Sequence, residues 1–210
     1  MPVITRLKVD RASPGRMQVT VDDRLRLSLP MLMTAALEVG KSPEPEDLER
    51  MICEDALFKA RRAALKDLSA RPRSREEIRR RLKAGGFPES VVEAVLDRLA
   101  SERYIDDSAF AREWAAWRSR NRPRSRLAVR AELKRKGVAE SAITEALEGW
   151  DDAALALACL EKKYRKRAEP WTEKDRRSAF DALRRKGFST GTALEAIGRY
   201  EECRRCNEGD

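Results

Sequence analysis

Residues 1–29 carry apolar side chains at alternating positions, in three short stretches that turn residues separate. The turns are Ser13-Pro14-Gly15 and Asp22-Asp23. Period-two spacing interrupted by such residues predicts strands joined as hairpins. The sequence therefore predicts a small three-stranded antiparallel β meander. Its apolar positions are Val3, Leu7 and Val9, then Met17, Val19 and Val21, then Leu25, Leu27 and Leu29.

After Pro30 the apolar period becomes helical. A meander this small is marginally stable alone and must pack against another element. The candidate is a long helix from about Pro45 to Ser69. Cys53 in this helix, and Cys159 further on, are expected to be small buried hydrophobes. The expected apolar stripe of the helix is Leu48, Ile52, Ala56, Ala60, Ala63 or Ala64, and Leu68.

From residue 71 onward the sequence repeats itself. Arg-Pro-Arg-Ser-Arg occurs at 71–75 and again at 122–126, and the residues that follow each copy also match. A fainter third copy, with Leu183, Gly187 and Phe188, follows at a shift of about fifty residues. A fixed period of this size indicates tandem copies of one small unit. The fold class predicted is therefore mainly α, a tandem array of three-helix repeats preceded by the β meander.

Each predicted repeat consists of short helices around a small core. Gly86, Gly137 and Gly187 are expected to end the first helix of each copy, because a residue just past a helix often needs positive φ. Phe110, Trp114 and Trp117 are expected to share one apolar face of a later helix. The predicted boundaries are 1–70 for the meander and long helix, 71–121 and 122–166 for two complete repeats, 167–202 for a partial third repeat without its last helix, and 203–210 for a polar tail.

The composition favours a polyanionic partner. The 210 residues include 45 Lys and Arg against 36 Asp and Glu, a formal net charge of +9. This balance fits nucleic acid, an acidic protein surface or an anionic membrane. No apolar run is long enough to span a bilayer, and no signal-peptide pattern opens the sequence, so we expect a cytoplasmic protein.

The residues that catalysis and metal binding require are scarce. The chain has no histidine, which excludes Ser-His, Cys-His and His-metal sites, and it has no recognisable phosphate-binding glycine loop. Cys203 and Cys206 have the spacing of a metal or redox pair, but no second pair completes a zinc site, and a frayed helix end is favoured. Asp106-Asp107 is best interpreted as helix capping. We therefore expect that the protein is not an enzyme and that it binds neither a cofactor nor a metal.

Basic residues recur with the repeat. Within a helix, Arg75, Arg79 and Lys83 are spaced i, i+4, i+8 and form one stripe beside the buried row. From 118 to 136 the chain has nine basic residues and one acid, Glu132. A solvated helix face is the alternative, but a stripe of one sign in register favours a binding surface. The candidate binding residues are Arg75, Arg79 and Lys83; Arg122, Arg124, Arg126, Arg130 and Lys134; and Arg176 and Arg184.

Three segments resemble the RecX family of RecA regulators. They are the 71–75 pentapeptide, the string from Asp97 through Tyr104-Ile105-Asp106-Asp107 to Phe110-Ala111, and Glu132 to Val138. The resemblance extends into the N-terminal region and covers nearly the whole chain. The chain departs from the family pattern at Arg103, where glycine is common.

The resemblance implies an array of helical units that binds RecA and its filament on single-stranded DNA. Family members lower ATP hydrolysis, strand exchange and co-protease activity and oppose filament growth. This implies a non-enzymatic regulator of DNA repair, expected as a monomer with weak direct DNA binding at most. The alternative is a basic helical-repeat protein that grips DNA phosphates directly, which a steep salt dependence without RecA distinguishes.

Overall fold

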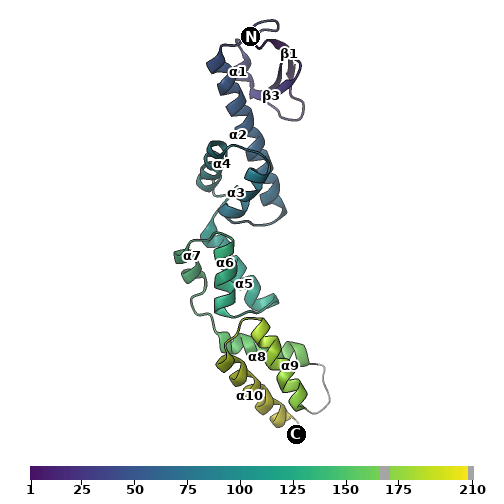
Figure 1. Ribbon diagram of the computed structural model, residues 1–210, viewed down its shortest axis with the longest axis vertical. Coiled ribbons are helices and arrows are strands. Elements are labelled where there is room, and N and C mark those ends of the chain that lie inside the picture. Colours follow the sequence, from purple (N-terminus) through teal and green to yellow (C-terminus); the bar gives the residue numbers. More distant parts are fainter. Residues whose placement is uncertain (166–170, 208–210) are drawn as a thin grey trace. The chain divides into compact units, whose positions relative to one another are not determined.

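The computed structural model describes residues 1–165 and 171–207 of the chain (Figure 1). The predicted boundary at 166/167 and the last residues of the predicted tail, 208–210, lie outside this part. Two compact units divide the chain. Unit 1 comprises Met1–Arg73 and Glu77–Ile105, and unit 2 comprises Ser74–Glu76 and Asp106–Asp210.

The N-terminal sheet of unit 1 is the predicted meander. Strands β1 (Ile4–Val9), β2 (Arg16–Val21) and β3 (Leu25–Pro30) pair antiparallel in the order β1-β2-β3. Asp22 and Asp23 both have positive φ, 49° and 54°, as a tight turn between β2 and β3 requires. The alternation of the sequence thus predicted both the strands and their pairing.

One face of the sheet packs against helices α1 (Met31–Thr34) and α2 (Pro45–Ala70). The side chains that meet there include Val19, Leu27 and Met51. The Asp55 carboxylate of α2 accepts a 2.8 Å hydrogen bond from the Ser28 backbone N–H of β3. This polar contact helps to set which side of α2 faces the sheet.

The predicted stripe of α2 was wrong at Ile52, although Leu48 at its N-terminal end packs against the core of the sheet as predicted. Ile52 is 42 % exposed, whereas Met51 is buried at 2 %. Cys53, expected to be buried, is also exposed. Further along the helix the stripe is confirmed, because Ala60 and Ala64 are fully buried.

The second half of α2 forms a three-helix core with α3 (Arg75–Ala84) and α4 (Glu89–Ser101). Ala60 and Ala64 belong to the same cluster as Ile78, Leu82 and Leu96. The long helix therefore completes the first repeat. The helices group one helix earlier than the predicted boundary at residue 71 implies.

Unit 2 repeats this plan twice. Helices α5 (Asp107–Asn121), α6 (Arg126–Arg135) and α7 (Glu140–Ala146) enclose one core, which includes Phe110, Val129 and Ile143. Helices α8 (Asp152–Tyr164), α9 (Glu173–Arg185) and α10 (Thr190–Asn207) enclose the next. The third repeat, predicted to lack a helix, has three, because α8 supplies the first. Helix α10 also extends past Cys203, where the sequence predicted a polar tail.

The three glycines expected to end helices all have positive φ: 80° at Gly86, 77° at Gly137 and 91° at Gly187. Gly137 has a further role. A Cβ atom on it would lie 2.3 Å from Cβ of Glu76, at the start of α3. Beside this contact the Ser74 hydroxyl donates a hydrogen bond to the Lys136 carbonyl. Glycine at 137 therefore also lets two segments of unit 2 approach closely.

Candidate functional site

Helices α3 and α6 carry the predicted basic stripes, and both stripes meet acids on the following helix. Lys83 pairs with Glu89 at 2.5 Å, and Lys134 pairs with Glu140 at 2.9 Å. Both members of the second pair lie 51 positions after those of the first. The recurrence of these lysines therefore has a structural explanation, an ion pair that joins the two helices of a hairpin.

The middle arginine of each stripe is also paired. The Arg79 guanidinium donates to both carboxylate oxygens of Glu93 on α4, at 2.6 and 2.9 Å. Arg130 pairs with Glu140 at 2.6 Å. The pKa of the Glu140 carboxyl is lowered, first by the hydrogen bond from Lys134 and further by the charges of Arg130 and Lys134. Much of the stripe's charge is thus balanced locally.

Where α5 ends and α6 begins, arginines greatly outnumber acids. The Glu132 carboxylate, 8 % exposed, accepts hydrogen bonds from Arg118 at 2.7 Å and from the Trp114 indole N–H at 3.0 Å. Arg124 reaches the other oxygen of Glu132 at 3.4 Å. The Arg118 guanidinium also lies 5.1 Å from the ring centres of Trp114 and Trp117, within cation–π range.

Three arginines of this region form no ion pair with a described residue, and one of them, Arg120, donates to the Ala116 carbonyl oxygen at 3.1 Å. Arg122 and Arg126 are exposed, and neither forms an ion pair with any residue in the part of the chain that the structure describes. Trp117, whose ring lies under the Arg118 guanidinium, is 41 % exposed, so the expected apolar face is only partly buried, whereas Phe110 is buried. We call Trp117, Arg120, Arg122, Arg124 and Arg126 the junction surface.

Helix ends in unit 2 are capped by acids, as the sequence predicted for Asp106-Asp107. The Asp106 side chain accepts from the Ala109 N–H at the start of α5. Asp107 accepts from the Arg75 N–H at 2.8 Å, and Asp152 accepts from the Arg126 N–H at 2.7 Å. The first arginine of each pentapeptide helix is therefore held by its backbone, which leaves the direction of its side chain to other contacts.

The third repeat retains the predicted cations without a stripe. Arg176 lies 3.8 Å from the Glu201 carboxylate of α10. The Arg184 guanidinium donates to the Phe188 carbonyl oxygen at 2.7 Å, which satisfies a backbone acceptor just after α9. Arg176 therefore lies near an acid of its own repeat, whereas the exposed Arg184 meets a backbone carbonyl and forms no ion pair with a described residue.

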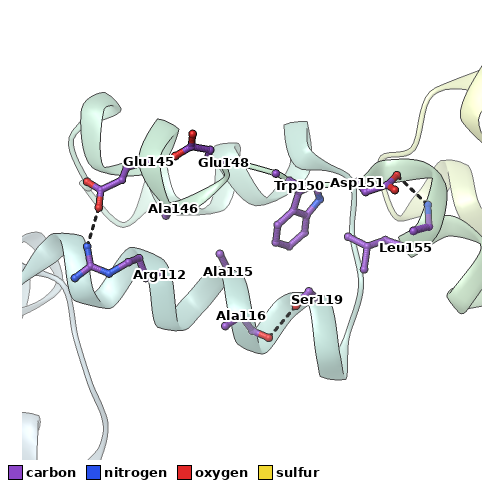
Figure 2. A pocket seen from close by; sticks show the side chains of 12 residues that line it. Arg112, Ala115, Ala116, Ser119, Glu145, Ala146, Glu148, Trp150, Asp151 and Leu155 are labelled. Atoms are coloured by element: carbon purple, nitrogen blue, oxygen red, sulfur yellow. Dashed lines mark hydrogen bonds and ion pairs between the residues drawn. The ribbon is translucent and has the colours of Figure 1, made fainter.

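A shallow groove of about 460 Å³ lies in unit 2, and the sequence did not predict it (Figure 2). Helix α7 has 7 residues, against 13 in α4, so the chain after Ala146 leaves part of α5 open. Trp150 projects over this opening toward Ala115, and its indole nitrogen is buried without a hydrogen-bond partner in the described part of the chain. The Arg112–Glu145 ion pair, 3.0 Å long, crosses one end of the groove.

Metal-binding and membrane-spanning features are absent from residues 1–165 and 171–207 as far as the structure describes them. Within these ranges no three side chains of the metal-binding types gather around a common point. Likewise, no described helix combines the length and apolarity needed to cross a membrane. Cys159 is buried, and burial raises the pKa of its thiol.

Models of two protein-family domains match the chain. The first, "RecX, first three-helix domain", covers residues 60–99, and the second, "RecX, second three-helix domain", covers residues 106–147. These spans coincide with the first two three-helix cores, including the second half of α2. The family models therefore group the helices as the packing does.

Curated relatives of the chain are named for the same family. A regulatory protein RecX of Mycobacterium avium is 35 % identical over 79 % of this chain and 92 % of its own length. One of Pelodictyon phaeoclathratiforme is 38 % identical over 60 % of this chain and 78 % of its own. One of Geobacillus kaustophilus is 32 % identical over 79 % of this chain, which spans only 62 % of that relative.

Two solved structures share the fold. A crystal structure of a regulatory protein RecX superposes with a TM-score of 0.67 at 23 % identity and covers 93 % of this chain and 98 % of its own. A RecX structure from Lactobacillus salivarius gives a TM-score of 0.59 at 20 % identity, over 70 % of this chain and 97 % of its own.

Proposed function

Because this chain belongs to the RecX family of regulatory proteins, we propose that it binds RecA and the RecA filament on single-stranded DNA. Bound there, it lowers ATP hydrolysis, strand exchange and co-protease activity and opposes filament growth. It acts as a cytoplasmic monomer. Inhibition of this kind needs no catalytic group, since a ligand shifts a filament between states through differential affinity alone.

The junction surface supplies the main contact with acidic groups on the filament. The observation that carries this assignment is the contrast in pairing described above. Arg79, Lys83, Arg130 and Lys134 are paired with acids of their own hairpins, whereas Arg122 and Arg126 form no ion pair with a described residue. An unpaired arginine keeps its full donor set for a partner, and arginine is enriched at protein interfaces.

The remaining candidate residues of the stripes shape the surface. Each exposed ion pair is worth less than about 1 kcal/mol, so the paired cations contribute little individually to binding. Together with the unpaired arginines they keep the face positive, which sets on-rate and orientation toward an acidic partner. Trp117 adds a half-exposed aromatic ring at the edge of the cationic area.

The experiment compares two double variants in a RecA ATPase assay on single-stranded DNA. Arg122→Gln/Arg126→Gln removes two unpaired charges from the junction surface and is expected to weaken inhibition at least tenfold. Arg98→Gln/Arg199→Gln removes two charges that are each already paired with an acid four residues away, and it should inhibit like the wild type. Strand exchange, measured in parallel, should follow the same order.

Two results would count against this function. If the wild-type chain at saturating concentration leaves RecA's ATPase and strand exchange unchanged, the RecA assignment is wrong for this chain. If both double variants inhibit equally well, the junction surface is a solvated face and the contact lies elsewhere. Circular dichroism of each variant excludes unfolding as the cause.

A further inference from the structure

The outer face of the N-terminal sheet carries cations that neither the repeat nor the family models include. In β1, Arg6 and Lys8 occupy alternate positions, and in β3 Arg26 lies on the same face. The pairing register places Arg6 opposite Thr20 and Thr20 opposite Arg26. These three residues form one row across the sheet, with an arginine at each end. All three cations are exposed, and the family-model matches begin only at residue 60.

These cations have no acid to balance them. None of Arg6, Lys8 and Arg26 forms an ion pair with a residue that the structure describes. The acids that lie nearest along the β2–β3 turn are Asp22 and Asp23, and Asp22 accepts a 2.8 Å hydrogen bond from the Val3 N–H. At the other end, Asp10 is buried and bonded to Ser28 and to the Ala12 N–H. The carboxylates of Asp22 and Asp10 are thus engaged in hydrogen bonds within the fold.

The face is hollowed where β1 leaves the sheet. Lys8, Val9 and Gln18 line a shallow depression together with the Asp10–Ala12 turn. Standard sheet spacings put alternate residues of one strand about 7 Å apart and residues two strands apart about 10 Å apart. Cations spread over such an area can reach several phosphates of one backbone at once, since duplex DNA carries one charge per roughly 1.7 Å of its axis.

The chemistry of this face favours nucleic acid over an acidic protein. The register places eight strand residues on this face, Arg6, Lys8, Arg16, Gln18, Thr20, Arg26, Ser28 and Pro30. Pro30, at the end of β3, is the one apolar side chain among them, and Arg16 is paired with Glu54 of α2 at 3.4 Å. Protein interfaces have apolar, often aromatic cores and few lysines. Phosphate oxygens, in contrast, are bound by arginine, lysine, threonine and glutamine side chains. Residues 1–30 contain no aromatic residue for stacking on bases, so contacts are to the backbone alone.

We propose that the outer face of the β1-β2-β3 sheet binds the phosphodiester backbone of a nucleic acid, without sequence preference, through Arg6, Lys8 and Arg26. This site is separate from the junction surface and does not depend on RecA. It gives the chain a second point of attachment on DNA, and linked weak sites bind more tightly than either site alone.

Fluorescence anisotropy with a labelled duplex, measured without RecA at rising KCl, tests this site. Each phosphate contact contributes about −0.9 to the slope of log affinity against log salt. Arg6→Gln/Lys8→Gln/Arg26→Gln should therefore flatten the slope by about 2.7. Between roughly 50 and 200 mM salt, the advantage of the wild type should then narrow about 40-fold.

A matched control keeps the loss of charge equal. Lys41→Gln/Arg50→Gln/Arg98→Gln removes three charges from the same unit, each already paired with a neighbouring acid, and should keep the wild-type slope. Gln18→Glu adds a negative charge to the middle strand without removing a cation and should also weaken binding, which covers the case that the triple variant folds poorly.

Three outcomes would overturn the sheet site. Equal slopes of log affinity against log salt for the folded triple variant and its control mean that the three cations do not contact phosphates. If the slope flattens in Arg122→Gln/Arg126→Gln but not in the triple sheet variant, DNA binds to the helices instead. Unchanged DNA binding combined with lost RecA inhibition in the triple variant assigns the face to a protein partner. Because the DNA assay contains no RecA, failure of the proposed regulatory function leaves its result unaffected.

Discussion

Replacing Gly137 by alanine tests how closely the segments of unit 2 approach each other. The new Cβ would lie 2.3 Å from Cβ and 2.5 Å from Cγ of Glu76. Carbon atoms prefer separations of about 3.5–4.0 Å, so one backbone segment must move by more than about 1 Å. Because Cβ of Glu76 is fixed by the backbone of α3, a change of rotamer cannot relieve the overlap.

The expected destabilisation has two parts. Alanine at φ of 77° costs about 1 kcal/mol for the left-handed conformation. Overpacking adds about 1–3 kcal/mol, so the sum is about 2–4 kcal/mol. Gly149→Ala is the matched control in the same unit. Its φ is 67° and nothing lies within 4 Å of the added Cβ, so only the conformational cost of about 1 kcal/mol applies.

Urea unfolding followed by tryptophan fluorescence measures both variants. All four tryptophans, Trp114, Trp117, Trp150 and Trp171, belong to unit 2, so the signal reports that unit alone. Glu76→Ala should not rescue Gly137→Ala, since it retains the clashing Cβ, whereas Glu76→Gly should recover part of the loss. Equal midpoints for Gly137→Ala and Gly149→Ala would refute the close approach.

Two further expectations follow from the backbone and the hairpin charges. Arg103 has φ of 61° just after α4, so Arg103→Gly should raise the stability of unit 1 by about 0.5–1 kcal/mol in thermal unfolding by circular dichroism, and a lower melting temperature would contradict the strain. Lys134→Met should raise the pKa of Glu140 toward its ordinary value, more than Arg130→Met does, in an NMR titration of the carboxyl carbon. Because the pKa of the Glu140 carboxyl is lowered in the folded state, its interactions with Lys134 and Arg130 stabilise the fold above the pKa of the unfolded carboxyl. This contribution disappears as the pH falls through the pKa of the folded state.

The local periods of the sequence were sufficient to predict the strands and helices and much of the packing. Alternation predicted three strands, and the structure confirms their antiparallel pairing. The repeat predicted glycines with positive φ at 86, 137 and 187, and all three are confirmed. These features depend on a few neighbouring residues, through backbone sterics and the pleat of a strand, so they can be read without knowing the tertiary contacts.

The repeat alone did not determine which helices share a core. A tandem array has the same period wherever a unit is taken to begin, so the sequence placed the start at the conspicuous pentapeptide. Packing places it one helix earlier, because Ala60 and Ala64 of α2 are buried with Ile78. The side of α2 that faces the sheet likewise depended on a distant contact, between Asp55 and the Ser28 N–H.

The candidate binding residues show the same division. The sequence alone determined that cations recur at fixed positions, because charge is a property of each residue. Only the tertiary structure decided which of them are already neutralised: Lys134 and Arg130 pair with Glu140, while the Arg122 and Arg126 guanidinium groups form no ion pair with a described acid. Ion pairing acts over a few ångströms between residues from separate helices, so the free charge of a surface emerges only when those helices are packed.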